Sequence, residues 1–419
     1  MKVLLCNSSM GGGGITTFAS QLIECLSADT ELTVVLGHDK AAPITNPKVK
    51  VIFHDTEALT IKNALFLINL INNVEKPDVV IASAALVVPV IAPYLNDNIK
   101  VFTVSHSGMN LHSDYCAVNH KYIDTIIAAS SDYNKHYLEH KFRIKNREKV
   151  KVIYNFVAAD DEMESLCLIK KDQRPISIVF AGAAAADKSP ELVAQVVYQL
   201  LKTDLDFRFY WTGNPGIPLA TTIFKHSKLK TVKQIMPDDR RLIFPGRIPD
   251  KRDYDRLLGS ANIMFAPSKN EGCSMALLEG HRAGCIFVVA DYENSNNEIV
   301  KKGNSGFVID HRKPEMFVDV ISDIIRYPKQ YEYLYDNSHK AFVNMMSYPV
   351  WKEKIFEVLN SPKNHTTRRR TARKLGVIGG ILKMKWLEFS GLIIHCVKLS
   401  LPSYLSFKKQ YALFNKETK

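Results

Sequence analysis

Short apolar runs alternate with amphipathic stretches over most of the chain, and this alternation predicts its secondary structure. The runs are rich in β-branched residues, which is typical of buried strands, and helical periodicity lies between several of them, for example over 61–74. Continuous apolar strands that alternate with helices indicate a parallel sheet covered on both faces. The predicted strands of the first half span 3–6, 32–36, 49–53, 79–82, 101–104, 123–129 and 150–153.

The same alternation resumes after a charged stretch, which predicts a linker between two domains. Residues 160–173 are rich in Asp, Glu and Lys. The chain is therefore expected to be an α/β protein with two parallel-sheet domains, and ligands bind such sheets at the carboxyl ends of the strands. The predicted strands of the second half span 176–181, 207–212, 242–244, 263–266 and 285–290.

The most informative stretch, 270–284, reads as the turn and helix between two of these strands. The helix is expected to begin close to Gly272 or Cys273, with Glu271 at the turn and Glu279 two helical turns further on. Free backbone N–H groups and the positive end of the helix dipole make such a helix start suitable for a diphosphate. The N–H groups expected there are those of Cys273, Ser274 and Met275. The alternative is a surface βαβ unit with two incidental glutamates.

This stretch resembles the Glu-x7-Glu motif of retaining glycosyltransferases of the GT-B fold, family 4. In that family the first Glu holds the donor-sugar hydroxyls and the second holds the nucleotide ribose. The order of elements up to about Leu359 follows the same family. The resemblance implies two Rossmann-like domains that face a central cleft. The implied parts are an acceptor-side domain at 1–159, the linker at 160–173, a donor-side domain at 174–346, a helix at 347–360 that crosses back to the first domain, and a tail at 361–419.

The resemblance also draws attention to two places in the first domain. Gly13 and Gly14 belong to a run of four glycines between a strand and a helix, and the spacing fits neither a dinucleotide fingerprint nor a P-loop. The family has a glycine-rich loop there, beside the donor phosphates and the acceptor. His106 follows a strand, where the resemblance implies contact with the donor sugar, and Ser107 is a weaker candidate. A lone histidine is otherwise most often structural.

In the second domain the loop from Gly182 to Lys188 departs from the family pattern. The family has an Arg and a Lys there that clamp the diphosphate; Lys188 matches, but Ala183 stands in place of the Arg. An alanine cannot bind phosphate bidentately as a guanidinium does. The resemblance places the nucleotide base near 246–248, which makes Arg247 a donor-binding candidate.

No metal site is predicted. Asp253-Tyr254-Asp255 matches the Asp-x-Asp metal motif of the other glycosyltransferase fold, but it lies within a helical stretch and is interpreted as a solvated helix face. The seven cysteines are scattered and have no metal-ligand spacing, which indicates reduced thiols in the cytosol. The start of the chain is too short an apolar run for a signal peptide.

The net charge of +12 is concentrated in the tail. Residues 361–419 contain 13 Lys and Arg against two Glu, so the preceding 360 residues carry a net charge of only +1. This balance argues against nucleic-acid binding by the two domains. The tail also has apolar residues at helical spacing, interrupted by charges, so a transmembrane helix is not expected. The stripe consists of Leu375, Ile378, Leu382, Trp386, Phe389 and Ile393.

A basic helix with such a stripe suits an anionic membrane surface. The alternatives are an oligomer-forming helix and a helix folded back on the body. Together these features predict a cytoplasmic, metal-independent, retaining glycosyltransferase, peripheral on the inner face of the membrane. It needs no cofactor, uses a UDP- or GDP-sugar, and transfers the sugar to a lipid-linked glycan in polysaccharide or lipopolysaccharide assembly. A sugar-nucleotide epimerase and a catalytically silent subunit that tethers partners at the membrane are the alternatives.

Overall fold

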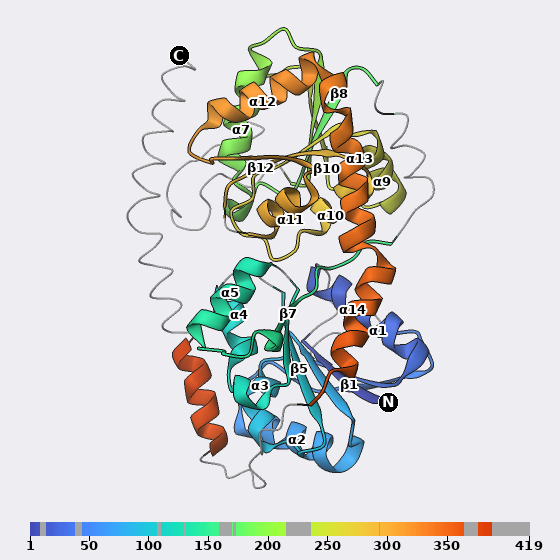
Figure 1. Ribbon diagram of the computed structural model, residues 1–419, viewed down its shortest axis with the longest axis vertical. Helices are drawn as coiled ribbons and strands as arrows, with labels where there is room; N and C mark the ends of the chain where they lie inside the picture. Colours follow the sequence, from blue (N-terminus) through green and yellow to red (C-terminus); the bar gives the residue numbers. More distant parts are fainter. Residues whose placement is uncertain are drawn as a thin grey trace.

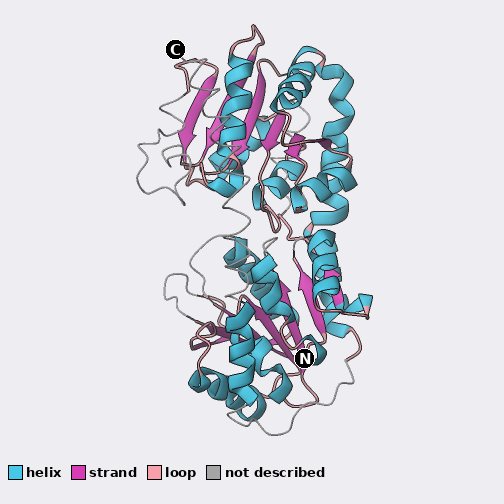
Figure 2. Cartoon of the chain, turned by 90° about the vertical axis from the view of Figure 1, so that its left-hand side faces the viewer, coloured by secondary structure: helices cyan, strands magenta, loops and turns pink. Residues whose placement is uncertain are grey.

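The computed structural model has two α/β domains, one above the other along the long axis of the molecule (Figures 1 and 2). It describes residues 1–8, 14–37, 44–106, 110–129, 131–158, 170, 173–214, 236–292, 294–363 and 376–387, with the side chains of 14 and 110–112 left out. The predicted linker, 160–173, lies almost entirely outside the described residues. The predicted pair of parallel-sheet domains is confirmed.

The N-terminal domain contains a seven-stranded parallel sheet in the order β3-β2-β1-β4-β5-β6-β7. Its strands are β1 (Lys2–Asn7), β2 (Glu31–Leu36), β3 (Val49–Phe53), β4 (Val79–Ser83), β5 (Lys100–Ser105), β6 (Thr125–Ala128) and β7 (Val150–Val152). Its α-helices are α1 (Gly14–Asp29), α2 (Ile61–Asn69), α3 (Val87–Ile91), α4 (Asn110–Ala117) and α5 (Asp132–Lys141). Separate apolar clusters cover the two faces of the sheet, as continuous apolar strands require.

The C-terminal domain contains a six-stranded parallel sheet in the order β10-β9-β8-β11-β12-β13. Its strands are β8 (Ile176–Ala181), β9 (Phe207–Thr212), β10 (Leu242–Gly246), β11 (Ile263–Ala266), β12 (Ile286–Ala290) and β13 (Gly306–Ile309). Its helices are the short 3-10 helix η6 (Ala186–Lys188), α7 (Pro190–Leu201), α9 (Lys251–Ser260), α10 (Met275–Arg282), α11 (Ser295–Gly303), α12 (Pro314–Arg326) and α13 (Glu332–Ala341). The strand order reverses between β8 and β11, and a parallel sheet binds its ligands at such a point.

The next helix, α14 (Tyr348–Asn360), returns to the N-terminal domain and lies beside α1 (Figure 1). Trp351 is 1% exposed, and its ring centroid lies 4.9 Å from that of Phe156 and 5.9 Å from that of Phe18. Lys100 donates a hydrogen bond to the Leu359 carbonyl at 2.9 Å. An apolar core and a polar contact thus anchor the end of the second domain on the first.

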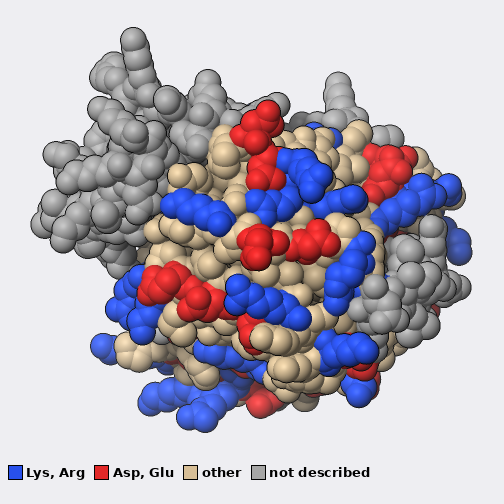
Figure 3. All heavy atoms as spheres, turned by 90° about the horizontal axis from the view of Figure 1, so that it is seen from above, with Lys and Arg blue, Asp and Glu red and all other residues tan. Residues whose placement is uncertain are grey.

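Charges on the C-terminal domain are mixed. On the face seen from above, Lys and Arg side chains alternate with Asp and Glu, and no region of a single sign dominates (Figure 3). This pattern agrees with the near-neutral balance of the two domains.

The described part of the tail is a helix at 376–387, here called the tail helix, which packs on the N-terminal domain. Val377, Ile381 and Met384 are buried in the core beside α3. Gly380 permits this approach, because a Cβ there would lie 2.9 Å from Val90 Cγ1. The helix folded back on the body, one of the alternatives for the tail, is therefore what the structure shows.

The apolar stripe predicted from the sequence lies on a different face of this helix from the one that is buried against the domain. Leu382 and Trp386 are 61% and 66% exposed, while the outer members of the stripe, at 375, 389 and 393, lie outside the described residues. The tail helix therefore has two apolar faces, one buried and one in solvent. Within the described segments, none of the helices has the length and apolar character needed to cross a bilayer.

Replacing Trp351 by Ala is expected to destabilise the protein by about 3–5 kcal/mol, because it empties a buried aromatic site. Trp386→Ala is a matched control, since that indole is 66% exposed and surface substitutions usually change stability by less than about 0.5 kcal/mol. Urea unfolding followed by circular dichroism measures both. Equal midpoints for the two variants would show that α14 does not stabilise the first domain.

Candidate active site

Helix α10 lies within the stretch 270–284, and it begins at Met275. Ser274 is its N-cap, and the Ser274 side chain accepts a hydrogen bond from the Leu277 N–H at 3.4 Å. The predicted start near Gly272 or Cys273 is therefore wrong, because the serine cap places both residues in the preceding turn. The N–H groups at the mouth of the helix that lack an intrahelical partner are those of Ser274, Met275 and Ala276.

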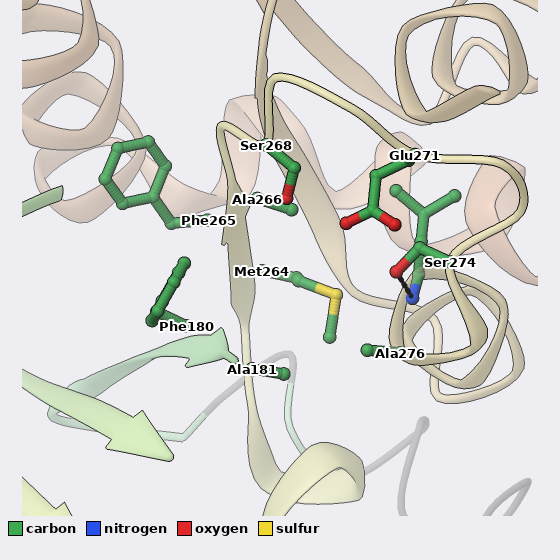
Figure 4. Close-up of a pocket in the computed structure, with 10 residues that line it drawn as sticks. Phe180, Ala181, Met264, Phe265, Ala266, Ser268, Glu271, Ser274 and Ala276 are labelled. Carbon is green, nitrogen blue, oxygen red and sulfur yellow. Dashed lines mark hydrogen bonds between the residues drawn. The ribbon is translucent and has the colours of Figure 1, made fainter. Parts of the chain in front are cut away.

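A pocket lies between the ends of β8 and β11 and the first turn of α10 (Figure 4). Glu271 is 9% exposed, and its carboxylate points into this pocket from the loop before α10. A carboxylate and a helix N-terminus thus share one small concave space. The pocket is lined by Phe180, Ala181, the residues at 264–266, Ser268, Glu271, Ser274, Ala276 and Leu277.

Lys188 pairs with Glu271 from the other side of the strand-order reversal, although it is not among the residues that line the pocket. It is the last residue of η6, and its ammonium group forms an ion pair and a hydrogen bond with the Glu271 carboxylate. Backbone atoms join the same loops, since the Lys269 N–H donates to the Asp187 carbonyl at 2.7 Å. Glu271, predicted to bind the donor sugar, and Lys188, predicted to bind the diphosphate, therefore contact each other directly. Ala183 lies in the same loop, between β8 and η6.

Glu279 is on α10 but does not line the pocket. Its carboxylate lies 3.6 Å from the Lys251 ammonium group at the start of α9. Burial raises the pKa of Glu279, and the positive charge of Lys251 opposes that rise. Glu279 therefore faces α9, in a second polar region next to the one that Glu271 occupies.

His106 lies directly after β5, at the carboxyl edge of the N-terminal sheet. Its Nε2 atom is 2.9 Å from the Ser83 hydroxyl at the end of β4, and the Phe18 ring packs edge-on against the imidazole at 4.9 Å. Burial lowers the pKa of His106 to about 4, so the ring is neutral at pH 7. Ser83 and Phe18 were missed from the sequence, because neither belongs to a motif.

The remaining predicted binding residues are spread over both domains. Gly13 and Ser107 lie outside the described residues, and Gly14 begins α1. Gly182 follows β8 and packs against the backbone of Gly213, whose φ of +89° suits glycine. Arg247 follows β10 and is exposed, and it is not among the residues that line the pocket.

Cys273 and the Asp-x-Asp motif offer no obvious chemistry. Burial raises the pKa of the Cys273 thiol to about 12, so it stays protonated and is a poor nucleophile. Asp253 and Asp255 are on helix α9, and Asp255 forms ion pairs with Arg282 at 2.8 Å and Lys251 at 2.7 Å. Among the described residues no group of three or more acidic, histidine or cysteine side chains is arranged to hold a metal ion. A metal-independent reaction stays a prediction.

The sequence also gave no indication of a polar contact between the two domains. Glu298 on α11 accepts a hydrogen bond from the Asp132 backbone N–H at 2.7 Å, and Tyr154 donates its hydroxyl to the same carboxylate. Lys302 lies 2.6 Å from the Asp132 carboxylate. The sequence does not show which helix ends meet.

Comparison with known proteins supports the architecture. Residues 168–341 match the family model described as glycosyl transferases group 1. HepE of Anabaena, solved in complex with UDP, superposes with a TM-score of 0.68 at 15% identity, over 86% of this chain and 100% of that one. The lipopolysaccharide outer core galactosyltransferase WaaB superposes with a TM-score of 0.65 at 15% identity, over 86% of this chain and 99% of that one. Sucrose-phosphate synthase of Thermosynechococcus elongatus superposes with a TM-score of 0.64 at 13% identity, over 85% of this chain and 98% of that one.

At these identities the likeness establishes the fold, which is GT-B. The family match covers the domain that contains Lys188, Glu271 and Glu279. The fold and the family match together support a glycosyltransferase of the GT-B class. The tail helix lies outside the matched residues.

The half-buried, neutral His106 is expected to make the fold sensitive to acid. The unfolded chain binds this proton below about pH 6.5 and the folded chain only below about pH 4, so unfolding free energy falls as the pH drops between these values. His106→Asn is expected to lose less stability over this range than the wild type does. Urea unfolding at several pH values measures the effect.

His136→Asn is the matched control, because the His136 side chain is 74% exposed. It is expected to follow the wild-type pH dependence. If His106→Asn and the wild type had the same slope, the imidazole would not be held neutral by burial.

Proposed function

We propose that this chain is a retaining glycosyltransferase of family 4 that uses a nucleotide sugar and no metal ion. The observation that carries the proposal is the pocket in which Glu271 and Lys188 meet the N-terminus of α10. A hydroxyl-rich sugar and a diphosphate need such a combination of a carboxylate, a cation and free N–H groups. The match of 168–341 to glycosyl transferases group 1 supports the same conclusion.

Each group in the pocket has a role in this scheme. Glu271 accepts hydrogen bonds from the sugar hydroxyls, and the N–H groups of Ser274 and Met275 hold the diphosphate. Lys188 adds a positive charge, which matters because Ala183 supplies none. Glu279 holds the ribose. The donor is a UDP- or GDP-sugar, and structures of the similar HepE contain UDP and UDP-glucose.

The reaction relies on electrostatic preorganisation. The diphosphate gains charge as the bond to the sugar breaks, and the helix N-terminus and Lys188 stabilise that charge without rearranging. As the resemblance to family 4 implies, the departing phosphate accepts the proton of the acceptor hydroxyl on the same face of the sugar. Neutral His106, at the carboxyl edge of the N-terminal sheet, orients the sugar. Closure of the domains excludes water, which would otherwise hydrolyse the donor.

We also propose that the acceptor is a lipid-linked glycan of polysaccharide or lipopolysaccharide assembly, and that the enzyme works on the cytoplasmic face of the membrane. The exposed face of the tail helix combines Leu382 and Trp386 with Lys383 and Lys385. Apolar and basic side chains on one face suit an anionic lipid surface, where each cation adds on the order of 1 kcal/mol.

One exposed lysine of the N-terminal domain extends this basic region. The pKa of His120 is lowered to about 4, first by burial and then by the positive charges of Lys149, Lys383 and Lys121. Of the two lysines of the body, Lys121 is exposed and Lys149 is buried, so only Lys121 can add to the surface near the tail helix. The membrane-facing region then includes the domain as well as the tail.

Replacing Glu271 by Gln is expected to lower kcat/KM for transfer roughly 10- to 100-fold while the fold is retained, because hydrogen bonds to a charged group contribute about 1.5–3 kcal/mol each. Glu315→Gln, at an exposed site on α12, is the matched control. Nucleotide release from UDP-, GDP- and ADP-sugars, with product analysis, measures the effect.

The same assay separates the alternatives. Unchanged transfer by Glu271→Gln would remove this residue from the scheme. Isomerised nucleotide sugar would indicate an epimerase, and no binding of any donor by the wild type would indicate a silent subunit.

The double variant Leu382→Ser, Trp386→Ser is expected to bind vesicles containing phosphatidylglycerol roughly 10- to 100-fold more weakly, because it removes two apolar side chains from the interface. Tyr333→Ser, at a 53% exposed site on α13, is the control. Vesicle sedimentation at low and high salt gives the measurement. Undiminished binding of the double variant would refute membrane docking by the tail helix.

A further inference from the structure

Helix α11 touches the N-terminal domain along one side. In Figure 1 it lies above α5 and to its right. The Glu298 carboxylate accepts hydrogen bonds from the Asp132 N–H, at the start of α5, and from the Tyr154 hydroxyl. Lys302, one turn further along α11, contacts the Asp132 carboxylate at 2.6 Å and the Tyr154 hydroxyl at 3.0 Å.

The first residues of the same helix hold the loop that carries Glu271. Asn294, the N-cap of α11, donates its side-chain amide to the Ser268 carbonyl at 2.8 Å and the Lys269 carbonyl at 3.2 Å. The Ser295 hydroxyl donates to the Glu271 carbonyl at 3.4 Å. The pocket loop is thus attached to α11 through the backbone at three successive points.

Only two residues, at 296 and 297, separate these two sets of contacts, so they form one rigid unit. Ser295 and Glu298 are both buried, at 0% and 6% exposed, and one turn of helix joins them. A shift of α11 at its domain contact therefore moves the anchors of the Glu271 loop as well.

The contact is complete only while the domains are together. Glu298 has three donors in the structure, namely the Asp132 N–H, the Tyr154 hydroxyl and Lys302. The Asp132 N–H belongs to the N-terminal domain, whereas the Tyr154 ring packs in an apolar cluster formed mainly by the C-terminal domain. Separation of the domains would therefore remove the Asp132 donor from the carboxylate. A buried carboxylate that loses hydrogen bonds is strongly destabilised.

We propose that Glu298 is a positioning residue that couples domain contact to the geometry of the donor pocket. With the domains in contact, Glu298 holds α11, and α11 holds the loop that aims Glu271. With the domains apart, the loop relaxes and the pocket is incomplete. The catalytic consequence rests on the proposed function, in which Glu271 binds the donor sugar, but the mechanical coupling does not.

The test compares Glu298→Ala and Tyr154→Phe with two neighbouring lysine variants on α11. Lys302→Ala removes a contact with the N-terminal domain, and Lys301→Ala removes an ion pair within the C-terminal domain, with Asp291 at 3.6 Å. Hydrogen exchange of the 268–275 peptide and small-angle scattering are measured without ligand, and UDP-glucose binding is measured by calorimetry. Circular dichroism checks folding, and Tyr154→Phe, which removes one hydroxyl, serves if Glu298→Ala does not fold.

Glu298→Ala is expected to speed hydrogen exchange of the 268–275 peptide on the order of 10-fold. The same variant is expected to increase the radius of gyration measured by small-angle scattering and to weaken UDP-glucose binding. Tyr154→Phe and Lys302→Ala are expected to change the same quantities less, and Lys301→Ala to match the wild type. If Glu298→Ala had a larger radius of gyration but unchanged hydrogen exchange at 268–275, the proposed coupling would be overturned. Faster exchange in a protein that binds no nucleotide sugar would support the coupling and count against the proposed function instead.

Discussion

The ion pair between Lys188 and Glu271 is the interaction on which the pocket depends. A carboxylate that is 9% exposed needs a partner, and the helix N-terminus alone offers only partial charges. Lys188 supplies that partner from a loop on the other side of the strand-order reversal. Since Ala183 removes the second cation of the family pattern, the same lysine has to serve both the carboxylate and an incoming diphosphate. The pocket is therefore close to electrically balanced before any donor arrives.

Two contacts of different character join the domains around this pocket. Trp351 of α14 is packed in an apolar core of the first domain, where its burial is insensitive to small shifts of the second domain. The contact of Glu298 is polar, so it depends on the alignment of a few donors. An apolar anchor with a directional polar contact permits movement between the domains and still defines one closed arrangement.

The tail helix is part of the fold and also exposes apolar side chains to solvent. Val377, Ile381 and Met384 bury one face against α3, while Leu382 and Trp386 remain in solvent on another. Because the helix is held by the N-terminal domain, a membrane bound through its outer face would lie at a fixed orientation to that domain. This geometry suits an acceptor that is itself part of the lipid layer.

By itself the sequence determined the class of fold and the candidates for chemistry. Apolar runs of β-branched residues specify parallel strands through local pattern alone, and the spacing of Glu271 and Glu279 and the strand-end position of His106 are visible in the chain. The tertiary structure alone decided which side chains meet. Lys188 and Glu271, or Tyr154 and Glu298, come from segments far apart, and only the order of strands and the approach of two domains bring them together. The packing of the tail helix could be decided only by the structure for the same reason. The sequence of a helix with two apolar stripes does not show which stripe is buried against the N-terminal domain.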